Sequence, residues 1–322
     1  MSAQARTPVG RAVRLLGGFL GLFFLSSLAV ALLHGRTGGR FGLGSGPVVA
    51  VVPVEGEIVR SDDFVETMRD LRDEEGVAAV VLRVDSPGGG VAPSQEMYAA
   101  VRDLAAKKPV VASLGSVAAS GGYYVASATD EIVASPGSLT GSIGVILSLT
   151  NVSGLLEKIG VQPDVLKAGS RKDMGSPFRA LSPEDRKVFQ EMLDQVHGQF
   201  IEAVAAGRKM DVAAMRKLAD GRVYTGQQAK ELGLVDRLGG LQEAVRAAAA
   251  RAGVEGEPEM EMRRPSRRPW WLRAVVGQEA EAPVEPPLAA LLGRLAQGVG
   301  RGGDARGGLL WRAPLATDGL RW

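Results

Sequence analysis

The residues from Gly115 to Tyr124 combine a potential nucleophile with the small neighbours that would expose it. An apolar run that ends at Leu114 is followed by small residues, then Ser120, Gly121 and Gly122, and then a helix-like segment. Because glycine has no Cβ, a substrate carbonyl can approach both the serine hydroxyl and the free N–H groups of a helix start. A serine hydroxyl is a weak nucleophile, so this reading requires a base within hydrogen-bond reach.

The base is not expected to be a histidine. The chain contains two histidines, His34 after a long apolar run and His197 within an amphipathic helical pattern, where ordinary packing explains it. A lysine can act as the base when apolar surroundings disfavour its charge. The chemistry alone leaves Lys167 and Lys172 as equal candidates.

Several motifs occur in one order along the chain and together resemble the signal peptide peptidase A family, in its short single-copy form. They are SPGGG at 86–90, ASGGYY at 119–124, LTGSIG at 139–144, SRKD at 170–173 with SP at 176–177, DGRVY at 220–224 and QAKELGLVD at 228–236. The resemblance covers roughly residues 48–250.

The resemblance implies a serine endopeptidase with a Ser-Lys dyad. Ser120 matches the family nucleophile, Lys172 matches the general base, and Ser142 matches a serine that orients the lysine amine. The implied substrates are cleaved signal peptides and similar small peptides, with no metal and no cofactor. A nucleic-acid partner is not expected.

Two groups of backbone amides are expected to hold the oxyanion of the tetrahedral intermediate. By resemblance, one donor is the amide of Gly89, with Gly88 as the neighbouring choice, and the other is the amide of Gly121. Each such donor lowers the barrier by roughly 3 kcal/mol. Taken separately, either glycine group would be explained by a tight strand-to-helix turn.

The hydrophobic pattern from residue 48 onward alternates between strands and helices, which predicts an α/β fold. We expect strands at 48–54, 78–84, 109–114, 131–134 and 165–167, and helices at 62–75, 93–107, 154–159 and 182–207, the last begun by Ser182. Two shorter helices follow, one of them capped by Thr225. Residues 48–252 would form the peptidase domain.

Periodicity does not choose among α/β folds, but the resemblance does. It implies the spiral of repeated ββα units that the family shares with the crotonases and the proteolytic subunit of Clp protease. It also implies a ring-shaped homo-oligomer in which the base comes from an adjacent protomer, so that sites lie at subunit interfaces.

Length and composition permit this organisation. The chain has 322 residues, 45% of them hydrophobic, and a net charge of +2 that says little about partners. The absence of cysteine excludes disulfides, zinc–thiolate sites and a thiol nucleophile.

The N-terminus predicts a membrane anchor. Residues 15–33 carry no charge and would span about 28 Å as a helix. Arginines precede this segment, so residues 1–14 are expected in the cytoplasm, and the catalytic domain, after a linker at 34–47, outside the inner membrane. A cleaved signal peptide is the alternative, because Ala29 and Ala31 have the small-x-small form of a cleavage site.

Residues 253–322 change in composition to Glu, Pro, Arg and Gly, which predicts a partly disordered tail. Residues 263–273 mix cations with aromatics and could instead touch anionic lipid. We expect a short helix at 288–295 and apolar docking by residues 309–322. One hypothesis is that the tail covers the entrance of the active site.

Two other functions use the same features. A crotonase-like acyl-CoA enzyme also needs paired oxyanion amides, but it would bind CoA and act on thioesters. A catalytically silent membrane scaffold would not react with serine-directed reagents.

Overall fold

The computed structural model describes residues 48–265 and 310–312. The segments predicted as a cytoplasmic N-terminus (1–14), an anchor (15–33), a linker (34–47) and a short helix (288–295) all lie outside these residues. Among the helices described, none combines the length and the apolar character needed to cross a bilayer.

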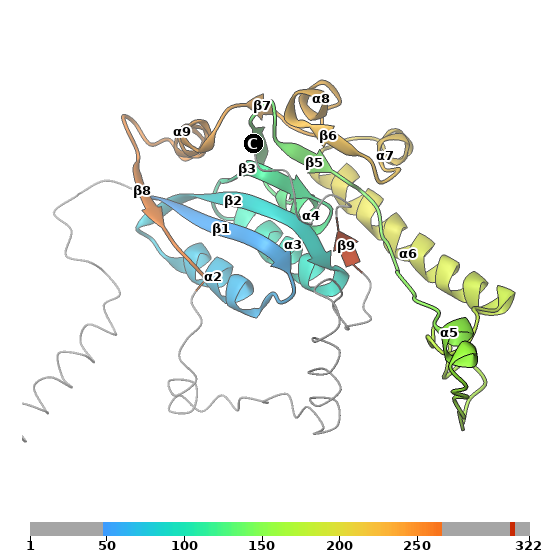
Figure 1. The fold of residues 1–322 in the computed structure, drawn as a ribbon. Helices are drawn as coiled ribbons and strands as arrows, with labels where there is room; N and C mark the ends of the chain where they lie inside the picture. The colour runs from blue at the N-terminus through green and yellow to red at the C-terminus, as the bar shows by residue number, and fades with distance from the viewer. Residues whose placement is uncertain (1–47, 266–309, 313–322) are drawn as a thin grey trace, which may run out of the picture. The chain divides into compact units, whose positions relative to one another are not determined.

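One mixed, mostly parallel sheet organises the described residues (Figure 1). Its main path runs in the order β6-β5-β3-β2-β1-β8, while β4 joins β3 to β7 and β9 pairs with β2. The two antiparallel pairs are β5 with β6 and β2 with β9. The strands are β1 Val48–Ile58, β2 Val77–Gly90, β3 Val110–Ala119, β4 Glu131–Ala134, β5 Leu139–Gly141, β6 Val223–Thr225, β7 Arg237–Leu238, β8 Glu259–Met262 and β9 Leu310–Arg312.

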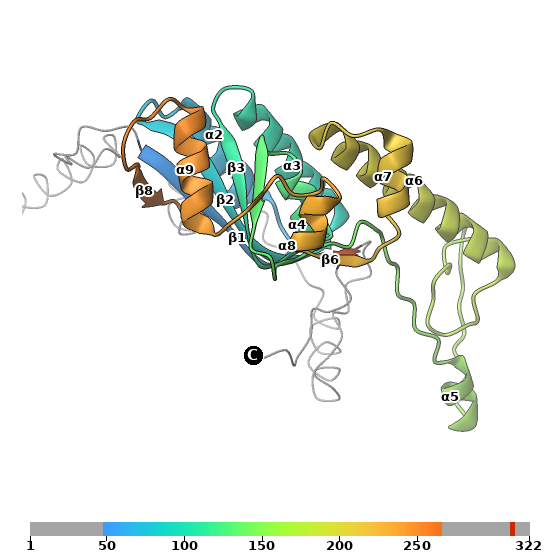
Figure 2. The same cartoon turned by 90° about the horizontal axis from the view of Figure 1, so that it is seen from above.

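Helices cover both faces of this sheet (Figure 2). The helices are α2 Asp62–Asp73, α3 Val91–Ala105, α4 Gly121–Ala126, α5 Ser153–Lys158, α6 Pro183–Gly207, α7 Val212–Leu218, α8 Gly226–Glu231 and α9 Leu241–Arg251. Alternate residues of β1 enter different cores: Ala50 and Val52 pack with α2, α3 and α4, whereas Val49 and Val51 pack with α9. Burial on both faces is what a parallel sheet requires.

Most predicted elements are confirmed to within a few residues. Ser182 caps α6 by accepting a hydrogen bond from the amide of Asp185, and Thr225 forms a complete capping box at α8. The strand predicted at 165–167 is wrong: this stretch has no partner strand, and Leu166 is 95% exposed. A short apolar run becomes a strand only where another strand can pair with it.

Two strands, β2 and β3, end later in the sequence than predicted. The second strand continues through the SPGGG motif to Gly90. The motif therefore pairs within the sheet and is not a turn after the strand, although Gly88 has a positive φ of 102°. The third strand forks the sheet: its residues Val111–Leu114 pair with β4 and Val117–Ala119 pair with β5. The fork leaves the end of β3, where Ser120 follows, beside the end of β5, where Ser142 follows.

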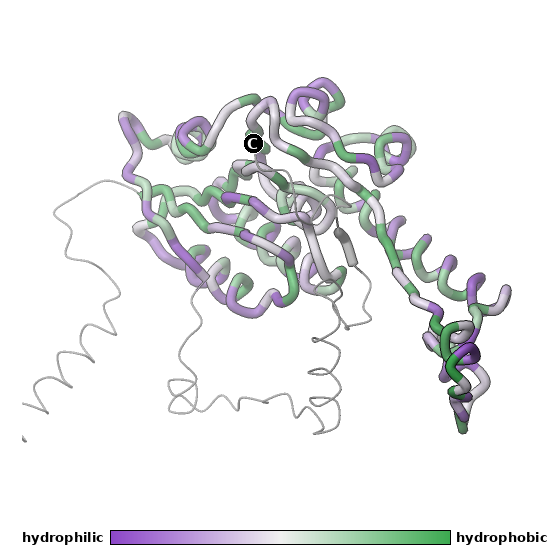
Figure 3. Tube along the Cα trace, in the orientation of Figure 1, coloured by the Kyte–Doolittle hydropathy of each residue, from purple (hydrophilic) through white to green (hydrophobic). Residues whose placement is uncertain are grey.

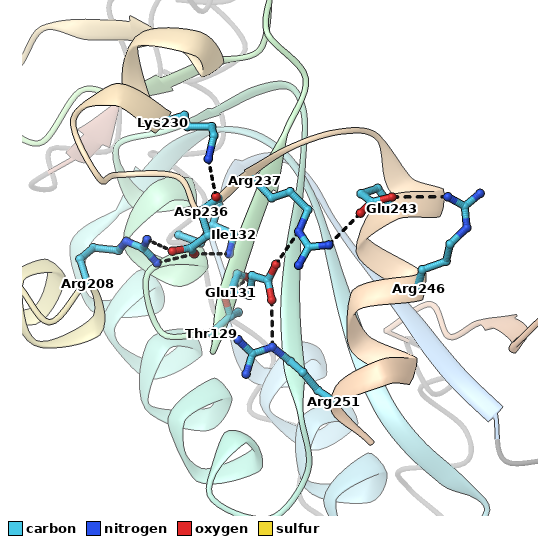
Figure 4. A network of polar contacts seen from close by, with 10 residues as sticks. All are labelled: Thr129, Glu131, Ile132, Arg208, Lys230, Asp236, Arg237, Glu243, Arg246 and Arg251. Atoms are coloured by element: carbon cyan, nitrogen blue, oxygen red, sulfur yellow. Dashed lines mark hydrogen bonds and ion pairs between the residues drawn. The ribbon is translucent and has the colours of Figure 1, made fainter. Parts of the chain in front are cut away.

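We call residues 48–144 and 183–265 the body. Two carboxylates bind its C-terminal part to β4 (Figure 4). Asp236 accepts hydrogen bonds from the backbone N–H of Ile132 and from the guanidinium of Arg208, and Glu131 pairs with Arg237 and Arg251. Beyond residue 253, where the tail was predicted, β8 adds to the sheet in parallel with β1.

Residues 145–182, which we call the arm, lie with α5 beside the N-terminal end of α6 and away from the sheet (Figures 1 and 2). The apolar spacing of α6 predicts core positions for Val188, Phe189, Met192, Val196 and Phe200. Of these, Phe200 is fully buried and Val196 packs partly buried against the core, and the helix also buries Ile201 and Val204. Phe189 instead contacts the arm, since its ring lies 3.1 Å from where a Cβ on Gly175 would be.

Hydrophobic residues occur on the arm as well as along the central strands (Figure 3). The exposed ones on the arm are Ile146, Leu149, Leu155, Ile159, Val161, Val165, Leu166 and Phe178.

Candidate active site

Ser120 lies between β3 and α4 in a strained backbone conformation. Its φ is 53° and its ψ is −123°, values that residues with a side chain rarely adopt. The conformation is held by two backbone hydrogen bonds, from Ser120 N–H to Gly141 C=O at 2.8 Å and from Tyr124 N–H to Ser120 C=O at 2.8 Å. Strain of this kind persists where the surrounding structure imposes it, and it concentrates at functional sites.

The hydroxyl of Ser120 is buried. The residue is 1% exposed, and its Oγ has no hydrogen-bond partner among the described residues. A buried hydroxyl without a partner costs free energy, so its retention indicates a chemical role or a partner from elsewhere.

Close packing brings together the two backbone segments whose amides are predicted to bind the oxyanion. A Cβ on Gly121 would lie 3.3 Å from the Cα of Gly88 and 3.3 Å from the N of Gly89. A Cβ on Gly122 would lie 2.7 Å from the carbonyl oxygen of Ser86. Glycines are therefore required here because the start of α4 and the SPGGG segment touch through their backbones.

Two buried serines hold that glycine segment, and one of them escaped the sequence analysis. Ser86 Oγ donates to the carbonyl of Gly56 at 2.5 Å and accepts from the N–H of Gly88 at 3.2 Å. Ser94, in the first turn of α3, donates to the carbonyl of Gly90 at 2.8 Å. The local sequence around Ser94 offered no signal beyond its place near a helix start.

Ser142 lies at the same edge of the sheet as Ser120. Ala119 pairs with Gly141, so the two serines directly follow residues that face each other across β3 and β5. Ser142 is 4% exposed and also has a positive φ, 51°. Two strained serines at neighbouring strand ends define this edge.

Lys172 is exposed on the arm, in a turn where its N–H donates to the carbonyl of Gly169. The next residue, Asp173, is bound by Arg179 at 2.9 Å and by Lys167 at 2.7 Å. These hydrogen bonds, chiefly those from Arg179, hold the pKa of Asp173 well below its usual range. The turn that carries Lys172 is thereby fixed to the rest of the arm.

The two candidate lysines differ in their contacts. The Nζ of Lys167 is occupied by Asp173, whereas the side chain of Lys172 has no hydrogen bond or ion pair within the described part of the chain. Neither amine bonds to Ser120 Oγ, which has no partner there.

His197 packs as the sequence predicted. Its Nε2 lies 3.2 Å from the carbonyl oxygen of Ile143 and makes no bond to Ser120. In the described ranges, no cluster of three or more His, Asp or Glu side chains is placed to hold a metal ion.

A strained serine at a strand-to-helix junction, opposite paired glycine amides in a mixed α/β sheet, is the framework of a serine-type hydrolase. Residues 102–255 match the family described as Peptidase family S49. The matched stretch includes Ser120, Ser142 and Lys172, but not the SPGGG segment.

Named relatives agree with that match. The chain is 48% identical over 183 residues to a Synechocystis protein named "Putative protease" and 42% identical over 187 residues to the "Putative signal peptide peptidase SppA" of Enterococcus faecium. It is 36% identical over 220 residues to the chloroplastic serine protease SPPA of Arabidopsis thaliana. The alignments take in 57%, 57% and 68% of this chain and 66%, 54% and 32% of those relatives, respectively.

These matches support the assignment of the chain to the signal peptide peptidase A family. The chain spans less than two thirds of the length of each of these relatives.

Proposed function

We propose that this protein is a membrane-anchored serine endopeptidase that hydrolyses cleaved signal peptides and similar small or unfolded peptides. The observation that carries the proposal is the hydroxyl of Ser120, which is buried on a strained backbone, has no hydrogen-bond partner in the part of the chain that the structure describes, and lies next to the amides of Gly89 and Gly121. Membership of a peptidase family supports the choice of a peptide bond as the substrate.

The reaction proceeds through an acyl-enzyme. Lys172, as a neutral amine, takes the proton of Ser120 Oγ while that oxygen attacks the peptide carbonyl. The amides of Gly89 and Gly121 hold the oxyanion, and the tetrahedral intermediate expels the amine, which receives its proton from Lys172. Lys172 then deprotonates a water molecule that attacks the ester. When the ester breaks, Lys172 returns this proton to the oxygen of Ser120.

Hydrogen bonding favours Gly89 over Gly88 as the first donor. The N–H of Gly88 already donates to Ser86 Oγ, which leaves the neighbouring amide as the better candidate. The Gly89 amide also lies against Gly121, where the second donor is.

Contacts on the arm favour Lys172 over Lys167 as the base. Lys167 is held by Asp173, whereas the side chain of Lys172 has no polar partner within residues 48–265 and lies in a turn where Asp173 binds Arg179. A base on an exposed arm is available to another protomer. Ser142, beside Ser120, would hold the incoming amine in line.

The whole assembly would be a ring of identical chains, each built on the spiral of repeated ββα units. Exposed apolar residues on the arm support this, since isolated soluble domains rarely display so many on one segment. Residues 15–33 would anchor each chain in the inner membrane with the catalytic domain outside, unless that segment is removed as a signal peptide.

Peptide hydrolysis by the full chain tests the chemistry. Ser120→Ala and Lys172→Ala should each lower kcat by about a thousandfold or more, while Lys167→Ala serves as the matched control and should keep most of the rate. Wild-type activity in Lys172→Ala would overturn the assignment of the base. If the wild type assembles correctly but does not hydrolyse peptides, a scaffold function is favoured. If it also hydrolyses thioesters, an acyl-CoA enzyme is favoured instead.

Mixing inactive protomers tests whether the base comes from a neighbour. Co-expressed Ser120→Ala and Lys172→Ala chains can combine an intact Ser120 from one protomer with an intact Lys172 from the next. We expect activity to return in the mixed oligomer only. No recovery in a verified mixed assembly would mean that both groups act within one chain.

A further inference from the structure

Ser142 has a backbone conformation that neighbouring groups must maintain. It directly follows the end of β5 at Gly141, is 4% exposed and has a φ of 51°. A positive φ is unfavourable for a residue with a Cβ, so it persists only where the surrounding structure imposes it. Two contacts of the segment after β5 supply that constraint.

The DGRVY motif at 220–224, which has no role in the proposed reaction, makes the first contact. The ladder between β5 and β6 continues by one bond beyond β5, from the N–H of Ser142 to the carbonyl of Arg222 at 2.8 Å. A Cβ on Gly144 would lie 3.3 Å from the Cα of Gly221. The backbone of the motif's turn therefore lies directly against the segment that follows β5.

Asp220 shapes this turn. Its Oδ1 accepts a hydrogen bond from the N–H of Arg222 at 3.0 Å, and its Oδ2 accepts one from Nε of the same arginine at 2.7 Å. Gly221, between them, has a φ of 86°, which favours glycine. Because an aspartate that bonds to the backbone two residues later closes an Asx turn, the position of the Arg222 carbonyl depends on the Asp220 carboxylate.

His197 on α6 makes the second contact. Its Nε2 lies 3.2 Å from the carbonyl oxygen of Ile143, a fully buried residue directly after Ser142. Because a carbonyl oxygen only accepts hydrogen bonds, Nε2 carries the proton in this contact. The bond joins α6 to the segment that contains Ser142.

Both contacts lie where the arm leaves the body. The arm begins at Val145 and ends at Ser182, which caps α6. The helix that follows the arm therefore also fixes, through His197, the segment that precedes the arm.

We propose that Asp220 and His197 are positioning residues that hold Ser142 in place to receive the amine of Lys172. The proposal rests on the proposed function, in which Ser142 aligns that amine for proton transfer. Each residue acts through the backbone of residues 142–144. Loss of either contact should lower kcat and leave KM nearly unchanged, because a misaligned base slows proton transfer more than it weakens peptide binding.

Peptide hydrolysis by two pairs of variants of the full chain tests this role. Asp220→Ala removes the oxygen that accepts from the Arg222 N–H, whereas Asp220→Asn keeps an amide oxygen there and loses only an exposed ion pair. His197→Leu removes the Nε2 donor, whereas His197→Gln keeps an amide N–H donor. We expect kcat to fall about tenfold or more in the Ala and Leu variants and to recover in the Asn and Gln variants.

Each pair has a matched control on another contact. Tyr98→Phe removes a bond of the same length to α6, since the Tyr98 hydroxyl donates to the carbonyl of Ala203 at 3.2 Å. Asp211→Ala removes a comparable Asp-to-backbone bond, because Asp211 Oδ1 accepts from the N–H of Ala213 at 2.9 Å. Both controls should keep kcat near the wild-type value. An equal loss in the controls, or no recovery in Asp220→Asn and His197→Gln, would overturn the positioning role.

Amide hydrogen exchange gives a readout that does not depend on catalysis. It is followed by mass spectrometry in full-length Ser120→Ala protein, which cannot cleave itself, for fragments that contain residues 142–148. We expect faster exchange there when Asp220→Ala or His197→Leu is added, and unchanged exchange with Asp220→Asn or His197→Gln. Protection of β1 and β2 in the same experiment shows that the body stays folded. Unchanged exchange of residues 142–148 in all four proteins would refute the proposal.

The two readouts separate two failures. If the wild type hydrolyses no peptide, the proposed function falls, and exchange of residues 142–148 alone decides whether Asp220 and His197 hold Ser142. If the wild type is active and exchange does not change, the activity stands and the positioning role is wrong.

Discussion

Ser86 supports the candidate site through two hydrogen bonds of its hydroxyl group. Its hydroxyl joins the carbonyl of Gly56 to the amide of Gly88 and is completely buried. Removing the hydroxyl leaves a buried carbonyl and a buried amide without that partner, at a cost of about 1–3 kcal/mol. The segment that carries Gly89 would then be held less firmly.

We expect Ser86→Ala to lower kcat by about tenfold or more with little change in KM, because oxyanion alignment matters chiefly in the transition state. Ser138→Ala is the matched control: that serine is also buried, and its hydroxyl donates to the carbonyl of Gly115 at 2.7 Å. Steady-state kinetics with one peptide measures both. An equal loss of kcat in the two variants would indicate general destabilisation and not positioning.

Substitution of Gly121 tests how closely the start of α4 must approach the SPGGG segment. In Gly121→Ala, the new Cβ would lie 2.5 Å from Ser94 Oγ and 3.3 Å from the N of Gly89. We expect a less stable and inactive protein, since overpacking costs about 1–3 kcal/mol.

The double variant Gly121→Ala with Ser94→Ala removes the first clash but leaves the methyl group beside Gly89. Its midpoint of thermal unfolding should recover toward the wild type, whereas peptide hydrolysis should remain lost. Recovery of activity together with stability would show that the amides of Gly89 and Gly121 do not share an oxyanion.

At the scale of elements, the arm depends on a small ion-pair group. Asp173 receives hydrogen bonds from Arg179 and Lys167, and Arg179 also binds Asp185 at the start of α6. This group ties the turn that carries Lys172 to the long helix α6. The position of the proposed base therefore depends on the ion pairs that the negative charge of Asp173 forms.

The pKa of Asp173 is lowered by its hydrogen bonds with Arg179 and Lys167, which sets the direction of the pH dependence. A carboxyl with a lowered folded-state pKa stabilises the fold above its ordinary pKa of about 3.9, and that stabilisation is lost as the pH falls below it. We therefore expect the protection factors of amides in the arm, which are corrected for the intrinsic pH dependence of exchange, to fall below about pH 4, before those of β1 and β2 fall.

Asp173→Asn should reproduce the acid effect at neutral pH. The variant should lower peptide hydrolysis about tenfold or more, because the turn of Lys172 loses its ion pairs, while the unfolding of the body changes little. Asp164→Asn is the matched control, since Asp164 is an exposed carboxylate on the same arm. The same loss of activity in the control would point to the net charge of the arm and not to the Asp173 contacts.

At the scale of the whole molecule, the arm carries the apolar surface expected of an interface. Leu166 is 95% exposed and Ile159 is 63% exposed, although both are large aliphatic residues. Such residues normally gain free energy by burial, so a second copy of the chain is the partner that the proposed ring supplies.

Replacing both residues, as Ile159→Asp with Leu166→Asp, should prevent assembly and abolish peptide hydrolysis while the body stays folded. Val212→Asp is the control, because Val212 is 41% exposed on α7 and lies outside the arm. Sedimentation velocity reports the assembly and circular dichroism reports the fold. An intact oligomer in the double variant would remove the arm from the interface.

The sequence by itself determined the features that neighbouring residues specify. Ser120 at the end of an apolar strand, the Ser182 cap and the Thr225 capping box were all predictable, because strand propensity and capping depend on residues a few positions apart. The order of motifs was also sufficient to indicate the family. These features need no knowledge of what packs against them.

Only the tertiary structure decided which distant segments meet. It placed Gly121 against Gly89, put the hydroxyl of Ser94 between Gly121 and the carbonyl of Gly90, and paired β9 with the end of β2. It also left residues 165–167 without a partner strand, where local β propensity had predicted one. The physical reason is that strand pairing and backbone contact are settled by which segment fills a given edge, and that competition is not encoded in local pattern.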